Sequence, residues 1–112
     1  MKTHYMNLHP SPFASINSGN KTIEMRLYDD RRKSIQTGDH IVFTNNESGS
    51  EITVEVVALY QYSSFEELYN HHSKESLGYT RNETPCHTDM LLYYTQEQIK
   101  QYGVLAIEIK VI

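Results

Sequence analysis

Alternating apolar and polar residues predict a small set of short strands along this chain. In residues 21–28, every second residue is apolar, while Glu24 and Arg26 fall on the opposite face, because successive side chains of a strand point to opposite sides. The same alternation predicts strands over residues 4–8, from Ile41 and Phe43 onward, over residues 52–59 and over residues 105–111. In the third of these, Ile52, Val54, Val56 and Ala58 are expected to share one side.

Short helices are predicted between these strands by residues that favour helix starts and turns. Pro12 begins a short helix or turn, since proline suits the first helical turn. Ser64 and Thr95 each match the start of a capping box, in which a side chain three residues later completes the hydrogen bonding. The polar residues 45–50 are expected to form a hairpin loop. Residues 73–92 show no clear periodicity, and we expect a loop with one helical turn there.

These elements predict one domain over residues 1–112, of the α+β class and mostly β. A chain of 112 residues suits a single domain. Five short strands have exposed edges, and curling the sheet into a barrel protects them. The expected fold is therefore a small β-barrel of about five strands flanked by short helices.

Composition narrows the range of partners. No apolar run approaches the roughly 20 residues that a membrane helix needs, and residues 1–5 do not resemble a secretory signal. Cys86 is the single cysteine, which favours a reducing compartment, so we expect a cytoplasmic protein without a membrane partner. The net charge of -4 argues against binding of duplex DNA, which usually requires a basic surface.

Basic residues are nevertheless concentrated in one part of the chain. Half of the ten lysines and arginines lie within residues 21–33: Lys21, Arg26, Arg31, Arg32 and Lys33. A local basic rim on an acidic protein suits one nucleotide or a short single strand better than a long duplex. The run Arg31-Arg32-Lys33 either forms a solvated turn or guides phosphates toward such a site.

Glu24 and Arg26 are the best candidates for binding a ligand. They lie two residues apart on one face of a strand, roughly 6.5–7 Å apart at the backbone. Their side chains can therefore form an ion pair on a solvated face or hold one ligand between them. An arginine offers a planar fork to phosphate or a base edge, and a carboxylate accepts from an amine or a ribose hydroxyl. Alternation alone does not place Lys21, which follows a turn and either belongs to the strand or reaches over its rim.

Other residue types give weaker indications. Four tyrosines near the ends of elements are candidates for stacking on bases, although half-buried core positions are the more common explanation for such residues. They are Tyr60, Tyr62, Tyr93 and Tyr94. The histidines do not show the spacing of a zinc site, and Cys86 has no activating base beside it. We therefore expect no metal and no cofactor.

Three sequence motifs together resemble the ASCH domain, a member of the PUA-like β-barrel superfamily. The first is Pro10-Ser11-Pro12-Phe13, and the second is Gly19-x-Lys21-x-x-Glu24-x-Arg26. The third is Gly38-Asp39-x-Ile41-x-Phe43. The resemblance covers nearly the whole chain except residues 73–92, and it implies a PUA-like barrel with a cleft between strands and helices.

The resemblance also implies an RNA-related role, because the superfamily is rich in modules that bind or modify RNA. One branch of small bacterial ASCH proteins hydrolyses the acetyl amide of N4-acetylcytidine nucleosides. This chain matches that branch at Lys21, has Glu24 where the branch has a threonine, and offers Glu75 as an approximate match for a glutamate after the middle helix.

Two functional hypotheses follow. In the first, the chain binds single-stranded RNA or a nucleotide through Lys21, Glu24 and Arg26, assisted by the basic run at 31–33. In the second, it is a metal-independent amidohydrolase of acylated nucleosides, with Lys21, Glu24 and Glu75 as catalytic residues. A lysine acts as a base only after losing its proton, and a neighbouring carboxylate such as Glu24 keeps it protonated. Binding is therefore the first hypothesis.

Overall fold

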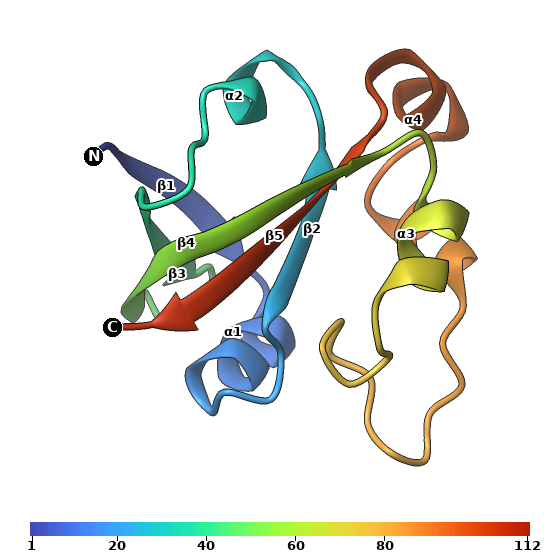
Figure 1. Cartoon of the computed structure of the whole chain (residues 1–112). Helices are drawn as coiled ribbons and strands as arrows, with labels where there is room; N and C mark the ends of the chain where they lie inside the picture. Colours follow the sequence, from blue (N-terminus) through green and yellow to red (C-terminus); the bar gives the residue numbers. More distant parts are fainter.

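A single curled sheet of five strands organises the molecule, as the computed structural model of residues 1–112 shows (Figure 1). The strands lie in the order β1-β3-β4-β5-β2, and β1 runs parallel to β3 while the other neighbours are antiparallel. Their bounds are β1 Thr3–Leu8, β2 Ile23–Leu27, β3 His40–Asn45, β4 Glu51–Tyr62 and β5 Val104–Val111. The predicted fold class is confirmed: the domain is mostly β, and the sheet forms a half-barrel with short helices around it.

The helices occupy the connections between strands. They are α1 Pro10–Asn17, α2 Asp30–Lys33, α3 Phe65–His71, the 3-10 helix η1 His87–Leu92 and α4 Gln96–Tyr102. The capping box at Thr95 is complete. The one predicted at Ser64 is only half formed, since Ser64 accepts from the Glu67 amide but the Glu67 carboxylate accepts from the Ser63 hydroxyl instead. The segment 73–92 is a loop that ends in η1, as expected.

Two apolar clusters lie on opposite faces of β5. Leu105, Ile107 and Ile109 belong to a cluster inside the curl of the sheet, together with residues of β1, α1, β3 and β4. Val104 and Ala106 belong to a second cluster, which packs β2 against α3 and η1. Because both faces of β5 are covered, this strand is buried along most of its length.

One strand departs from the predicted alternation. The register of β4 against β5 shifts between Val56 and Ala58, so Val57 is an extra residue in the ladder. Such a bulge switches the faces of the residues that follow it. As a result Leu59, and not the predicted Ala58, packs against the inner cluster.

Candidate functional site

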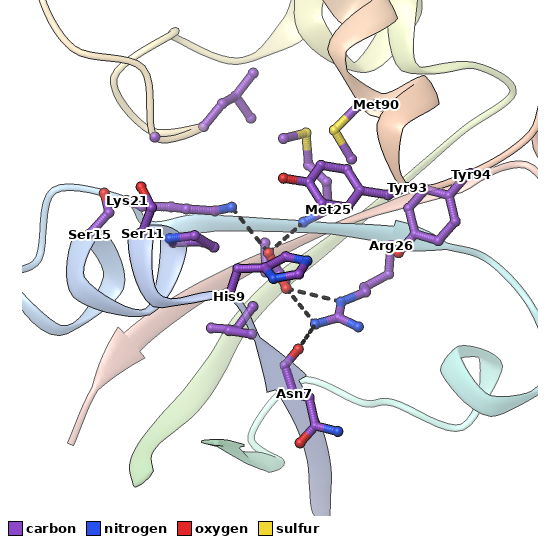
Figure 2. A pocket seen from close by; sticks show the side chains of 15 residues that line it. Asn7, His9, Ser11, Ser15, Lys21, Met25, Arg26, Met90, Tyr93 and Tyr94 are labelled. Atoms are coloured by element: carbon purple, nitrogen blue, oxygen red, sulfur yellow. Dashed lines mark hydrogen bonds and ion pairs between the residues drawn. The ribbon is translucent and has the colours of Figure 1, made fainter. Parts of the chain in front are cut away.

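A pocket lies where the two free edges of the sheet approach each other. β1 and β2 end the strand order and do not pair with one another. The end of β1, the start of α1, β2 and the segment between Leu77 and Tyr94 surround a cavity of about 410 Å³ (Figure 2).

Glu24 lies at the base of this pocket and is only 4% exposed. Its Oε1 lies 3.2 Å from Lys21 Nζ, and its Oε2 lies 2.8 Å from Arg26 Nη2. Arg26 Nε also donates to Oε2 at 3.0 Å. In Figure 2, Lys21 and Arg26 approach from opposite sides. The three residues of the predicted motif therefore form one buried cluster, which we call the charge triad.

Arg26 and Lys21 keep the Glu24 carboxyl ionised. Burial by itself raises the pKa of Glu24, but the two positive charges and their hydrogen bonds outweigh it, so the pKa is lowered. Burial also opposes the charge of Arg26, but Glu24 more than offsets this and raises the pKa of the guanidinium. With Lys21 protonated, the triad carries two positive charges against one negative charge.

Arg26 also joins the two edge strands. Its Nη2 donates to the Asn7 carbonyl of β1 at 2.9 Å, so one guanidinium connects Glu24 of β2 to the backbone of β1. Side-chain bonding thus replaces the backbone ladder that β1 and β2 lack. The other terminal nitrogen, Nη1, has no hydrogen bond within the protein, which leaves a donor for a ligand.

The backbone of β2 presents its free edge to the pocket. On the side of β5, the Thr22 carbonyl accepts from the Ile109 amide, and the Tyr28 amide donates to the carbonyl of Gly103, which directly precedes β5. Since backbone groups alternate between the two edges of a strand, the amide of Met25 points away from β5. That amide donates to Glu24 Oε1 at 3.2 Å, so the triad also provides a hydrogen-bond acceptor for a backbone amide on the unpaired edge of β2.

Lys21 lies just before β2, in the turn that follows α1. Its amide donates to the Ser15 carbonyl, and the amides of Thr22 and Ile23 donate to Ser76. The stem of Lys21 passes close to Gly78, where an added Cβ would lie 3.1 Å from Lys21 Cδ. The segment around residues 76–78 therefore forms a wall that holds the lysine toward Glu24.

Two aromatic rings stand at the mouth of the pocket. Tyr93 is 54% exposed, and its ring centroid lies 5.9 Å from that of His9. Behind them Tyr94 lies partly buried, and burial raises the pKa of its phenol, which keeps it neutral. Tyr93 and Tyr94 were among the predicted stacking candidates. His9 was not, because no short-range pattern links the end of β1 to η1.

A family comparison identifies the chain. The family model of the ASCH domain matches residues 6–112. The chain belongs to the ASCH domain family.

Solved structures with the same architecture fall into two groups. Hypothetical protein PH0355 is 34% identical, with a TM-score of 0.83 and complete coverage of both chains. Protein PF0455 from Pyrococcus furiosus is 33% identical over 98% of this chain and 97% of that one, with a TM-score of 0.71. The ASCH domain from Lactobacillus crispatus is 16% identical, covers 96% of this chain and 79% of that one, has a TM-score of 0.60, and shares the fold alone. No protein with a curated description matches the chain.

The remaining predicted residues of this ASCH domain lie outside the pocket. Arg32 pairs with Asp29 at 2.8 Å, and Lys33 lies 3.7 Å from Asp30, so both contribute to the short helix α2. Arg31 donates to the Tyr5 carbonyl on β1. Glu75 is exposed and does not line the cavity.

Histidine and tyrosine side chains also form a cluster away from the pocket. Tyr62 bonds to His72 at 2.9 Å, and its ring stacks on His71. Tyr60 bonds to Glu108 on β5. Neither tyrosine reaches the charge triad. No group of three or more His, Cys, Asp or Glu side chains is placed to hold a metal ion, and no helix has the length and apolar character needed to cross a bilayer.

Proposed function

We propose that the pocket of this ASCH domain binds a nucleotide, either alone or within single-stranded RNA. The observation that carries the proposal is the convergence of Lys21, Glu24 and Arg26 on one recess beside the open edges of the sheet. In this proposal Lys21 and Arg26 meet a phosphate or base edge, and Glu24 orients the ligand by accepting from an amine or hydroxyl. The cytoplasmic location expected from the sequence is part of the same proposal.

The size and lining of the pocket support this choice. Its volume of about 410 Å³ lies within the roughly 300–1,000 Å³ of small-molecule sites. Arg26 Nη1 has no protein partner, and a guanidinium is well suited to phosphate or guanine. Tyr93 and His9 offer ring faces at the mouth, and aromatic side chains stack on unpaired bases.

Hydrolysis of an acylated nucleoside such as N4-acetylcytidine is the second candidate. The contact between Lys21 and Glu24 favours it, because a lysine and a carboxylate at 3.2 Å can exchange a proton. Two observations place it second. Lys21 is engaged in the ion pair with Glu24, and Glu75 lies exposed outside the pocket.

The binding proposal is tested by titrating the wild type and Arg26→Ala with the four ribonucleoside 5′-monophosphates. We expect the variant to lose about tenfold or more in affinity, since a hydrogen bond between charged groups is worth about 1.5–3 kcal/mol. Arg81→Ala is the matched control, because Arg81 is exposed and does not line the pocket. Circular dichroism establishes that each protein is folded.

Arg26→Lys covers the case in which the alanine variant unfolds, because it keeps the charge and loses the planar fork. Equal affinity of the wild type and either folded Arg26 variant would remove the triad from the binding site. The same samples are incubated with N4-acetylcytidine and analysed for cytidine by chromatography. Turnover that disappears in Lys21→Ala would instead favour the hydrolase.

A further inference from the structure

The free edge of β1 carries two arginines at regular spacing. The carbonyls of Lys2 and Leu8 accept from the backbone amides of His40 and Asn46, at the two ends of β3. The backbone groups of the even-numbered residues of β1 therefore point toward β3. The odd-numbered carbonyls therefore face the open edge. Two of them are occupied: the Tyr5 carbonyl accepts from Arg31 Nη2 at 3.2 Å, and the Asn7 carbonyl accepts from Arg26 Nη2 at 2.9 Å.

The spacing of the two carbonyls that hold Arg31 and Arg26 suits a chain of phosphates. Carbonyls two residues apart on a strand lie roughly 6.5–7 Å apart, which is similar to the separation of successive phosphates in an extended single strand. Each arginine uses only part of its donor set on the protein. A guanidinium already held by a carbonyl also loses less side-chain freedom when it meets an anion.

Arg31 differs from its neighbours in helix α2 by having no acidic partner. Arg32 and Lys33 are paired with Asp29 and Asp30, whereas Arg31 bonds only to a carbonyl. The positive charge of the triad is therefore continued along β1 by one uncompensated arginine. In a chain with a net charge of -4, this local excess marks a path for an anionic polymer.

We infer that the ligand of this site is a single strand of RNA and not an isolated nucleotide. One nucleotide occupies the pocket, and the adjoining phosphate lies along the edge of β1 and bonds to Arg31. This inference rests on the proposed function, because the pocket supplies the first nucleotide site. A peptide strand is the competing occupant of a free edge, but the carbonyls of Tyr5 and Asn7, two of those that it would pair with, are already bonded to arginines.

The test compares hexaribonucleotides with the corresponding monophosphates on the wild type, Arg31→Ala and Lys33→Ala. Lys33 is the matched control, because it lies on the same helix and its loss changes the net charge equally. We expect Arg31→Ala to bind hexamers about tenfold more weakly and to bind monophosphates like the wild type. Its plot of log affinity against log salt concentration should be shallower by about 0.7, the value for one phosphate contact on a single strand.

Several results would overturn the inference while leaving the pocket proposal standing. They are equal hexamer affinity of Arg31→Ala and Lys33→Ala, hexamers that bind no better than monophosphates, and equally effective competition by inorganic polyphosphate. If monophosphates fail to bind the wild type and hexamers fail with them, the pocket proposal itself is wrong.

Discussion

Glu24 shows how a charged residue can be almost fully buried on a strand. Its carboxylate has two cationic partners and a backbone amide, so its oxygens are well satisfied away from water. Removing one member of a buried group of charges usually lowers stability by more than the whole group contributes, because the remaining charges stay buried without a partner of opposite sign. The triad is therefore sensitive to substitution in a way that a solvated pair is not.

Glu24→Gln should lower the free energy of unfolding by about 3 kcal/mol at pH 7, because Lys21 and Arg26 stay partly buried without their counterion. The pKa of Glu24 is lower in the folded protein, so its stabilising effect is present above the ordinary pKa near 4.5 and is lost as the pH falls below it. The variant should therefore lose less stability on acidification than the wild type.

Urea unfolding between pH 7 and pH 3 measures both effects. Glu55→Gln is the control, because Glu55 is exposed on β4 and has no ion-pair partner. If Glu24→Gln and Glu55→Gln lowered stability equally, the buried triad would not contribute as described.

At the scale of elements, the pocket depends on the wall that the segment after α3 builds against β2. Gly78 has a φ of +103° and touches the stem of Lys21, so this position combines a left-handed backbone with close packing. Gly49, in the hairpin between β3 and β4, has a similar φ of +79° and nothing within 4 Å of an added Cβ. The two glycines therefore separate backbone strain from displacement of the lysine.

Gly78→Ala should lower both stability and nucleotide affinity, whereas Gly49→Ala should lower only stability. The shared effect is backbone strain, of order 1 kcal/mol. The loss of affinity arises because the new methyl group pushes Lys21 away from Glu24. Thermal unfolding and monophosphate titration of both variants check this, and unchanged affinity in Gly78→Ala would show that the wall does not position the lysine.

Strand alternation predicted β2 well because its information is local. The apolar face of β2 enters the second cluster and the polar face carries Glu24 and Arg26, as the alternation indicates. The same rule failed after Val57 in β4, because a bulge depends on the partner strand. The wall at Gly78 could not be predicted either, since the contact joins two loops that are far apart in sequence.

At the scale of the whole molecule, β1 forms one side of the pocket, and Asp39 holds this strand in place. Asp39, which precedes β3, accepts from the amides of Lys2 and Gln36 and bonds to His4 at 2.9 Å. These bonds, led by that of the Lys2 amide, hold the pKa of Asp39 well below its usual range. A buried carboxylate thus fastens the beginning of β1 to the start of β3.

Asp39→Asn should lower the melting temperature at pH 7, and it should lose less stability than the wild type when the pH is lowered. The carboxylate stabilises the fold above its ordinary pKa of 3.8, and this contribution is lost as the pH falls below that value. Asp30→Asn is the control, because Asp30 is exposed and only loosely paired. A melting temperature and acid profile equal to those of Asp30→Asn would contradict this role.

The strand order was beyond the reach of sequence patterns. Alternation identifies strands but does not show that β1 pairs in parallel with β3, because that pairing skips β2. The pocket follows from this order, since it leaves β1 and β2 as the two free edges. The motif residues and Tyr93 were therefore predictable, whereas Asn7 and His9 became visible as pocket residues only once the strands were placed.

The burial of β5 on both faces has a consequence for how the chain folds during synthesis. Each apolar cluster takes residues from this strand, which follows every other strand in the sequence. Neither cluster is complete until residues 104–109 have left the ribosome. Nascent chains that end before residue 104 should remain sensitive to protease, and protection should appear over both clusters together once β5 has emerged.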